Sequence, residues 1–291
     1  MKTLPNTATT GVAIMVVAML IAPFMDLFAK LATAYVVPGE AALGRFIAQS
    51  IFLMPFMTVL GEWGRPRPAH AIAGLCAAVA IMSINMALVV MPIANAIAIF
   101  FVEPLILTVL SALILKEKIG WRRLSAVAIG LVGAMVVLRP NLSLYGWAAV
   151  YPLITALGFA GYMIVMRAMS PGGGRIGLQF WIGVVAALVL GIVHGAGTLM
   201  GVEGLSLTWP EGHVLWLFAA AGGLACLTHQ LIAQALARAE AAAVAPLQYL
   251  EIVTATGIGL VIFGDFPDRL TLLGTLIIVG SGIYVFRREQ Q

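Results

Sequence analysis

Charged residues and cysteines are scarce in this chain, and each shortage excludes a class of protein. Asp, Glu, Lys and Arg together make up only 10% of its 291 residues, whereas ordinary soluble domains carry about 25%. A water-soluble fold would lack the polar surface that it needs. The two cysteines, Cys76 and Cys226, both lie inside apolar runs, which indicates packed side chains and excludes a disulfide-stabilised scaffold.

The motifs of common hydrolases are missing as well. The sequence holds no Walker loop, no H-E-x-x-H, no G-x-S-x-G and no zinc-type group of Cys and His residues. Gly264-Asp265 resembles part of an intramembrane aspartyl protease motif, but it lacks a second matched aspartate. We therefore expect a protein that is not an enzyme, with no catalytic residue, no bound metal and no cofactor.

Apolar residues are abundant instead. They make up 62% of the chain, and the mean hydropathy is +1.06. Since a bilayer core takes roughly 20 apolar residues per helix, we expect an all-α polytopic membrane protein with ten transmembrane helices. The apolar windows place these helices at residues 11–35, 41–61, 70–90, 93–115, 121–138, 145–166, 176–199, 213–236, 241–263 and 270–286.

Basic residues are distributed unequally between the two sides of this topology. Twelve Lys and Arg residues fall on the side of the termini, three (Lys30, Arg139 and Arg269) fall on the other side, and Arg45 lies within the second helix. Because cytoplasmic loops carry the excess of Lys and Arg, we expect both termini in the cytoplasm. The net charge of +4 then reflects topology and contact with anionic lipid, and we expect no nucleic-acid partner.

The chain also contains a weak internal repeat. A shift of 148 positions aligns Phe101-Val102-Glu103 with Tyr249-Leu250-Glu251. We therefore expect two related domains, residues 1–140 and 141–291, with five helices each. Because five is an odd number, the second domain enters the bilayer from the opposite side. Inverted repeats of this kind are typical of carriers that bind a solute near the bilayer midplane.

Glu103 and Glu251 lie near the middle of the fourth and ninth helices, where an ionised side chain costs about 2.5 to 3.5 kcal/mol. One interpretation is that they line a transport cavity and bind a cation, an amine or a coupling proton. Pro104 supports it, because a proline frees a backbone carbonyl close to Glu103. The alternative is that both are structural acids that hydrogen-bond neighbouring helices. We favour the cavity.

Three further charges lie in the first two helices. Asp26 and Lys30 are four residues apart, so they share a helix face and are expected to form a structural ion pair. A gate or a substrate contact is the alternative for this pair. Arg45 lies early in the second helix, from where its side chain is expected to snorkel toward the headgroups.

Uncharged polar and aromatic residues complete the candidate substrate site. Solute cavities combine a few polar groups with aromatic walls. By this criterion the candidates are Asn85, His229, Gln230, Tyr249, Phe101 and Tyr162. Taken singly, each of them is explained as well by helix packing and interhelical hydrogen bonds.

The order of these motifs resembles the drug/metabolite transporter superfamily, in its EamA-type branch of ten-helix bacterial carriers. The resemblance spans essentially the whole chain. It rests on Asp26 with Lys30, Arg45-Phe46, Leu115-Lys116-Glu117-Lys118, Gly130 with Gly133, Ala245-Pro246, Tyr249-Leu250-Glu251, Phe263-Gly264-Asp265-Phe266-Pro267-Asp268, and Thr271-Leu272 before Gly274.

The resemblance implies a carrier in the cytoplasmic (inner) membrane of a bacterium. It moves a small-molecule solute by alternating access, through a central cavity between inverted five-helix repeats. We expect a monomer or a homodimer. Similar proteins carry riboflavin, S-adenosylmethionine, amino acids or exported compounds. We take riboflavin or a similar aromatic metabolite as the first substrate, because the expected walls are aromatic, and S-adenosylmethionine or an amino acid as the alternative. An intramembrane enzyme and a non-catalytic scaffold are the competing interpretations.

Overall fold

The computed structural model describes residues 5–61, 63, 65–114, 116, 121–169, 176–208, 210–236, 238 and 245–289, and within these ranges every regular element is a helix. The first half forms α1 (Pro5–Ala32), α2 (Pro38–Leu60), α3 (Pro68–Leu88), α4 (Ile93–Phe100), α5 (Glu103–Ile114) and α6 (Trp121–Tyr145). The second half forms η1 (Gly146–Val150), α7 (Tyr151–Met169), α8 (Ile176–Leu199), α9 (Gly212–Leu236), η2 (Ala245–Tyr249), α11 (Leu250–Ile258), η3 (Gly259–Phe263) and α12 (Arg269–Glu289). Of the sequence motifs, Leu115, Glu117 and Lys118 lie outside the described residues, as do the side chains of Ala245 and Pro246.

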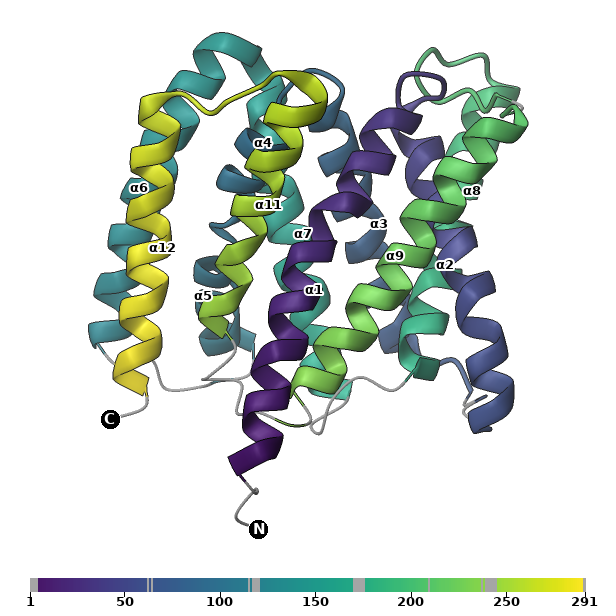
Figure 1. Ribbon diagram of the computed structural model, residues 1–291. Coiled ribbons are helices and arrows are strands. Elements are labelled where there is room, and N and C mark those ends of the chain that lie inside the picture. Colours follow the sequence, from purple (N-terminus) through teal and green to yellow (C-terminus); the bar gives the residue numbers. More distant parts are fainter. Residues whose placement is uncertain are drawn as a thin grey trace.

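The described helices make up ten apolar segments, as the sequence predicts. Seven windows are long and apolar enough to cross a membrane. One of them, Ala128–Met166, contains parts of both α6 and α7, and two shorter apolar helices, Leu247–Phe263 and Arg269–Ser281, complete the set. The protein is therefore an all-α polytopic membrane protein. The beginning of α1 and the end of α12 lie on the same side of the bundle (Figure 1).

Proline and glycine determine where α2 and α3 begin and where α2 ends. Both helices begin at a proline, Pro38 and Pro68, that follows a residue in extended conformation. Proline suits the first helical position because its φ is already helical and the N–H that it lacks would be unpaired there in any case. At its other end, α2 is followed by Gly61, whose φ of 66° lies in the left-handed region that favours glycine.

The fourth span is two helices, whereas the sequence predicts one helix over residues 93–115. α4 ends at Phe100, a two-residue turn follows, and α5 begins at Glu103. Pro104 explains the break, because it has no N–H to donate to the carbonyl of Phe100 four residues earlier. The prediction identified the freed carbonyl but not the interruption that it causes.

The ninth span, predicted as one helix over residues 241–263, changes its winding twice. Its described part begins as the tight 3-10 helix η2, continues as α11 and ends as the wide π-helix η3. The first change comes at Tyr249, which is 148 positions after Phe101 in the break of the fourth span. Irregular backbone at membrane depth is tolerated where it is buried in protein or lines a watery cavity. Both spans therefore mark the region where a solute site is expected.

The fifth span is longer than the sequence predicts. α6 continues through Pro140 to Tyr145, seven residues beyond the expected end at residue 138. Asn141 supports this extension, because its Nδ2 donates to the carbonyl of Val137 at 2.7 Å. Its Oδ1 accepts a hydrogen bond of 2.8 Å from Nδ2 of Asn95, which belongs to α4. The end of α6 is thereby tied to α4, the first half of the broken span.

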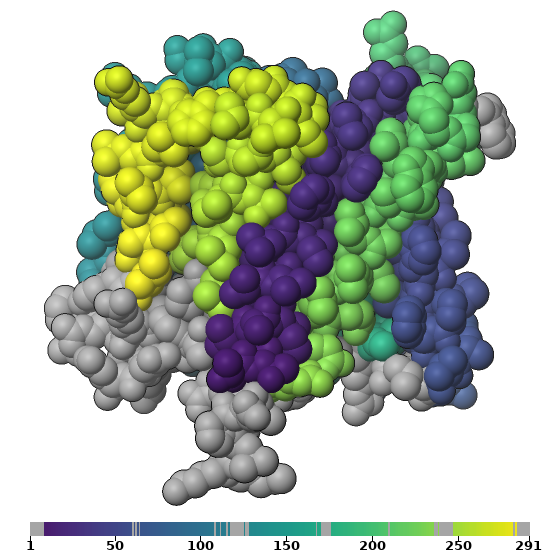
Figure 2. Space-filling view, viewed as in Figure 1, coloured from purple at the N-terminus to yellow at the C-terminus, as the bar shows by residue number. Residues whose placement is uncertain are grey.

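Helices of the first half pack against helices of the second half in matched pairs. α1 lies along α9 and α7 along α3, while α2 meets α8 and α6 meets α12. Figures 1 and 2 show α1 at the front of the bundle, between α9 and α11. If each helix is replaced by its counterpart in the other half of the expected repeat, the α1–α9 pair becomes the α7–α3 pair. The α2–α8 and α6–α12 pairs are unchanged by this replacement.

Small residues permit the closest of these approaches. A Cβ atom at Gly222 of α9 would lie 2.7 Å from the carbonyl oxygen of Arg45 in α2, and one at Gly274 of α12 would lie 2.7 Å from the carbonyl oxygen of Gly133 in α6. Both distances are too short for a side chain. The two helix pairs thus meet backbone to backbone at these glycines.

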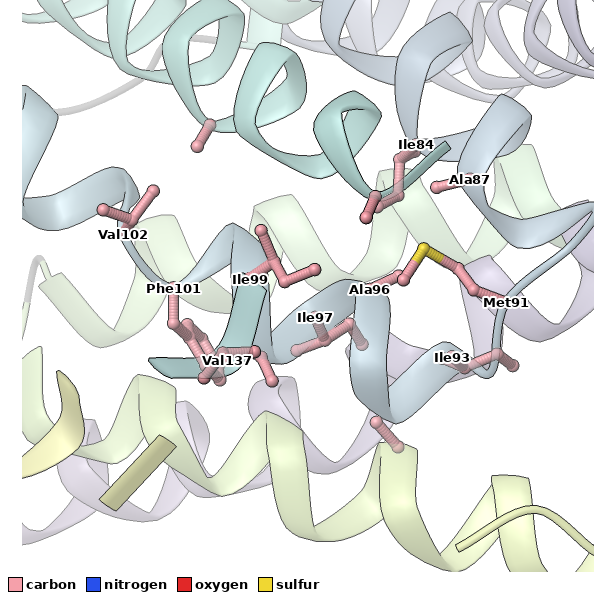
Figure 3. Close-up of a cluster of buried hydrophobic side chains, with 14 of the residues drawn as sticks. Ile84, Ala87, Met91, Ile93, Ala96, Ile97, Ile99, Phe101, Val102 and Val137 are labelled. Atoms are coloured by element: carbon pink, nitrogen blue, oxygen red, sulfur yellow. The ribbon is translucent and has the colours of Figure 1, made fainter. Parts of the chain in front are cut away.

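The largest buried apolar cluster surrounds α4. Figure 3 shows Ile93, Ala96, Ile97 and Ile99 of this helix among apolar side chains from α3 and α6. Every α4 residue from Ile93 to Ile99 is buried. The half-helix is therefore held in the protein interior, in contrast to spans such as α12, where Leu276 is 69% exposed and faces the position of the lipid.

Candidate substrate-binding site

Glu103 opens α5 in the interior of the bundle, directly after the break in the fourth span. The residue is only 7% exposed, and its Oε1 has no hydrogen-bond partner among the described residues. Burying a carboxyl group without a partner is unfavourable. The fold therefore leaves an unmet interaction at the middle of this span, as the cavity interpretation of Glu103 requires.

Tyr249 approaches Glu103 from the ninth span. Its hydroxyl group is close enough to the Glu103 carboxyl group to interact with it electrostatically. Its ring meets the buried ring of Phe101 edge to face, with centroids 5.3 Å apart. The two irregular spans thus bring together three residues that the sequence predicts for the site.

Aromatic rings continue from this pair without interruption. Phe101 neighbours Phe100 with centroids 6.2 Å apart, Phe100 meets Phe159 of α7 at 5.7 Å, and Phe159 meets Tyr162 at 5.3 Å. We call the five residues Tyr249, Phe101, Phe100, Phe159 and Tyr162 the ring row. Centroid distances of this size are favourable for aromatic pairs. The ring row forms a continuous aromatic surface inside the bundle, with Glu103 at the Tyr249 end.

Arg45 lies at the Tyr162 end of the ring row, and the prediction that it snorkels to the headgroups is wrong. The residue is 5% exposed. Its guanidinium interacts electrostatically with Asp26 of α1, Tyr162 of α7 and His229 of α9. Because Arg45 faces these helices and not lipid, its side chain has no path along the surface of the bundle to the headgroups.

Neighbouring groups orient Tyr162 and His229 around Arg45. The side-chain amide of Gln179 donates to the Tyr162 hydroxyl group at 3.1 Å. His229 Nδ1 lies 2.6 Å from the carbonyl oxygen of Ala225. Since a carbonyl oxygen only accepts, Nδ1 carries the proton and Nε2 is the acceptor nitrogen. The site thus presents two oriented polar groups beside the guanidinium.

Lys30 does not form the ion pair with Asp26 that the sequence predicts. Its ammonium group donates to the carbonyl of Met91 at 2.9 Å and lies 4.6 Å from the ring centroid of Phe263. Lys30 is one turn nearer than Asp26 to the end of α1, and a long side chain there reaches a carbonyl in the connection between α3 and α4 and an aromatic face. The shared helix face allowed the pair, but these tertiary contacts prevail.

Asp26 instead faces the interior of the bundle. It interacts electrostatically with Arg45 and with Glu251 of α11, and both acids are only partly buried. Glu251 therefore lies toward α1, whereas Glu103 lies toward Tyr249. The two glutamates that align in the internal repeat occupy different surroundings.

Two predicted residues remain apart from this group. Asn85 is fully buried, and its Nδ2 donates to the carbonyl of Pro38 at 3.1 Å, which joins the end of α3 to the start of α2. Gln230 is partly buried on α9. In the described part of the chain, no hydrogen bond joins Asn85 or Gln230 to the ring row or to Arg45.

The sequence interpretation missed Phe159 and Gln49. Phe159 lies three residues before Tyr162 and so shares its face of α7. Gln49 lies four residues after Arg45 on α2, and its buried Oε1 has no partner among the described residues. The helical spacing from an already predicted residue is the signal that would have found both.

The group of residues has the chemistry of an organic-solute site. Within the described ranges, no three His, Cys, Asp or Glu side chains are placed to hold a metal ion. Glu103 lies beside Tyr249 at one end of the ring row, and Arg45 lies beside Tyr162 at the other end, where it interacts with Asp26, which also interacts with Glu251. Such a set suits a small molecule that carries charges of both signs and an unsaturated ring.

Known proteins resemble the chain in sequence and in fold. It is 27% identical over 289 residues to an S-adenosylmethionine uptake transporter of Rickettsia felis, a match that covers 98% of this chain and 95% of that protein. It is 26% identical over 261 residues to a riboflavin transporter of Rhizobium johnstonii, covering 87% and 82% of the two proteins. One solved crystal structure has the same fold, with a TM-score of 0.65, 19% identity and coverage of 97% and 99%.

Residues 9–139 match the sequence profile of the EamA-like transporter family. This range corresponds closely to the first of the two expected domains. Proteins named as transporters align with nearly the whole chain. The first half of the chain is therefore similar to the EamA-like transporter family, and the whole chain is similar to bacterial solute transporters.

Proposed function

We propose that this transporter is a secondary carrier for a small, charged, ring-bearing metabolite, with S-adenosylmethionine as the first candidate. One observation carries the choice: a continuous row of aromatic rings has Glu103 at one end and the buried Arg45, with Asp26 near it, at the other end. S-adenosylmethionine has a sulfonium centre, an ammonium group, a carboxylate and a purine ring, so each part meets a group of suitable chemistry. The name of the Rickettsia relative supports the same candidate.

Riboflavin is the second candidate. The ring row favours it, because a flat tricyclic ring stacks well on aromatic side chains, and the name of the Rhizobium relative agrees. Riboflavin is uncharged at neutral pH, however, and offers no counter-charge to Arg45 or to the three acids. The charge at the site therefore reverses the order of the two candidates that the sequence suggested.

The proposed working units are residues 1–140 and 141–291, which act as inverted five-helix repeats. The matched helix pairs and the equivalent positions of the two irregular spans support this division. The site residues Asp26, Tyr162 and His229 come from α1, α7 and α9, so the α1–α9 pair and the α3–α7 pair both contribute to it. Rocking of one pair against the other then opens the site to each side in turn.

The proposed location is the cytoplasmic membrane of a bacterium, with both termini inside the cell. The distribution of Lys and Arg along the sequence supports this orientation. The beginning of α1 and the end of α12 lie on the same side of the bundle (Figure 1), which agrees with this orientation.

Uptake of labelled S-adenosylmethionine into liposomes that contain the purified protein tests the proposal. We expect saturable uptake that excess unlabelled S-adenosylmethionine inhibits and riboflavin does not. The opposite pattern of competition would give riboflavin priority, and uptake of neither compound would overturn both candidates. Recovery of chemically unchanged solute inside the liposomes separates transport from an intramembrane enzyme reaction.

Glu103→Gln is the informative variant for this assay. The substitution removes the negative charge but keeps the shape, so we expect uptake to fall about tenfold or more, the loss typical of a charged hydrogen bond. The matched control is Glu211→Gln, which neutralises an acid whose side chain is 82% exposed in the loop before α9. Equal loss in both variants would indicate a general effect of charge on the protein.

A further inference from the structure

Arg45 is a buried charge whose hydrogen-bonding groups are unused. The residue is 5% exposed, and its Nε has no hydrogen-bond partner among the described residues. No hydrogen bond or ion pair joins the guanidinium to any residue that the structure describes, and its nearest aromatic face, Phe46, has its centroid 5.9 Å from Cζ. A guanidinium has five N–H donors. A buried guanidinium without acceptors destabilises the protein. The position of Arg45 therefore points to an anionic ligand.

Asp26 lies beside Arg45 with the opposite charge, yet the two side chains do not form an ion pair within the described residues. They interact only at longer range. Asp26 is partly exposed, and Glu251 is a second acid close enough to interact with it electrostatically. Adjacent anion-binding and cation-binding groups therefore both remain available.

We propose that Arg45 and Asp26 bind the head group of an α-amino acid, with the α-carboxylate on Arg45 and the α-ammonium on Asp26. The rest of the solute lies along the ring row, which begins at Tyr162 beside Arg45 and leads to Glu103. The inference rests on the proposed function and extends it from one candidate to a substrate class. Riboflavin has no such head group and falls outside the class.

Simpler ligands match this pair of residues less well. A carboxylate alone satisfies Arg45 but brings its negative charge close to Asp26. An amine alone satisfies Asp26 but is repelled by Arg45. An α-amino acid carries both charges on one carbon atom, so a single group meets neighbouring opposite charges that do not neutralise each other directly.

Binding measurements on the purified full-length protein in detergent test the assignment. The probes are S-adenosylmethionine, its decarboxylated analogue and 5′-methylthioadenosine, which lacks the whole head group. We expect wild-type protein to bind S-adenosylmethionine about 100-fold more tightly than the decarboxylated compound, since an unpaired buried charge is left in the latter complex. In Arg45→Gln this ratio is expected to fall to about threefold or less. Equal binding of both compounds by wild-type protein would overturn the inference.

Thermal stability without ligand separates a binding role of Arg45 from a structural one. Arg45→Met removes a buried charge that has no partner, so we expect the melting temperature of the ligand-free protein to stay the same or to rise. A structural arginine would lower it. Arg238→Gln is the control, because Arg238 is exposed and donates to the carbonyl of Gln234. Its described hydrogen bonds do not involve a site residue. We expect this control to change neither the melting temperature nor the binding ratio.

The proposed function and the head-group assignment can fail separately. Tight, carboxylate-dependent binding without uptake into liposomes would overturn the carrier but support the assignment. If wild-type protein does not bind S-adenosylmethionine at all, the same comparison is made with L-tryptophan, tryptamine and indole-3-propionate. A preference for L-tryptophan over both analogues, lost in Arg45→Gln, would support the assignment. The absence of such a preference would sink it.

Discussion

The rings of Phe101 and Tyr249 meet edge to face with centroids 5.3 Å apart, although the residues are 148 positions apart in the chain. They are also the residues that align when the second half is shifted onto the first. In the proposed inverted repeat, equivalent positions touch each other only near the axis that relates the two halves. The pair therefore marks the centre of the bundle, and Glu103 lies beside it.

Removal of the Tyr249 ring is expected to weaken solute binding. An aromatic pair contributes about 0.5 to 1.5 kcal/mol beyond its buried area, so Tyr249→Ala should raise the KM for uptake about tenfold. Tyr249→Phe keeps the ring contact with Phe101 and loses only the hydroxyl group near Glu103. We expect it to stay within about threefold of wild type. Equal damage in the two variants would assign the role to the hydroxyl group and not to the ring.

Pro104→Ala should trade transport rate for stability. Alanine has the N–H that proline cannot offer to the carbonyl of Phe100, and it favours a continuous helix by up to about 3 kcal/mol. We expect a higher melting temperature and a lower rate of uptake, because Glu103 loses its place at a helix start. Pro55→Ala, inside α2, is the control and should leave the rate unchanged. Wild-type uptake by Pro104→Ala would show that the break is dispensable.

Asn141 should contribute strongly to stability. Its side chain accepts from Asn95 at 2.8 Å and donates to Thr271 Oγ1 at 3.2 Å, which links α4, α6 and α12. Asn141→Ala removes the described acceptor of the buried Asn95 Nδ2, at a cost of about 1 to 3 kcal/mol in the free energy of unfolding. Thr58→Ala, which removes an exposed hydroxyl group, should cost about 0.5 kcal/mol or less. Thermal unfolding in detergent compares the two.

Asp268 should make stability depend on pH in the acid range. Partial burial acts to raise the pKa of Asp268, but hydrogen bonds from the Thr271 hydroxyl group and from the N–H groups of Thr271 and Leu270 outweigh it and hold the pKa below its usual 3.8. A carboxyl group whose pKa is lower in the folded state stabilises the protein above its unfolded pKa. This contribution is lost as the pH falls through the folded value.

The expected result for Asp268→Ala follows from its place before the first turn of α12. At pH 7 the variant loses a helix cap, which costs about 1 kcal/mol. Below about pH 4, wild-type protein loses part of the same stabilisation, so the difference in melting temperature between the two should shrink. A difference that stays constant from pH 7 to pH 3 would contradict the assigned hydrogen bonds.

Gly222 should tolerate no side chain. A Cβ atom there would lie 2.6 Å from the Cβ of Ala48 and 2.7 Å from the backbone nitrogen of Gln49. Gly222→Ala should therefore push α9 away from α2 and destabilise the protein by about 1 to 3 kcal/mol. The matched control is Gly195→Ala in α8, where a Cβ atom meets nothing within 4 Å. This second variant should gain stability from the better helix propensity of alanine.

The spans were predictable from the sequence because lipid imposes a length and a composition on each helix. The seventh span was predicted at residues 176–199 and lies there in the structure. Pro104 also carried a usable signal, since a proline inside an apolar span removes a backbone hydrogen bond. The sequence showed that Pro104 frees a backbone carbonyl close to Glu103. The break between α4 and α5 was not predicted.

The surroundings of Arg45 and Lys30 were not predictable in this way. Helical spacing states which residues share a face, but not which helix that face will meet. Lys30 donates to the carbonyl of Met91, 61 positions away, and Arg45 interacts electrostatically with side chains of α1, α7 and α9. Only the packing of distant helices decides such contacts, and a single sequence holds no direct record of it.

The glycine contact between α6 and α12 has a consequence for the study of motion in this protein. The backbones of Gly133 and Gly274 touch, and Asn141 bonds Thr271 across the same seam. Two helices joined so closely cannot slide or separate without breaking both kinds of contact. The α6–α12 pair is therefore the best reference frame in which to measure how far every other helix moves during the transport cycle.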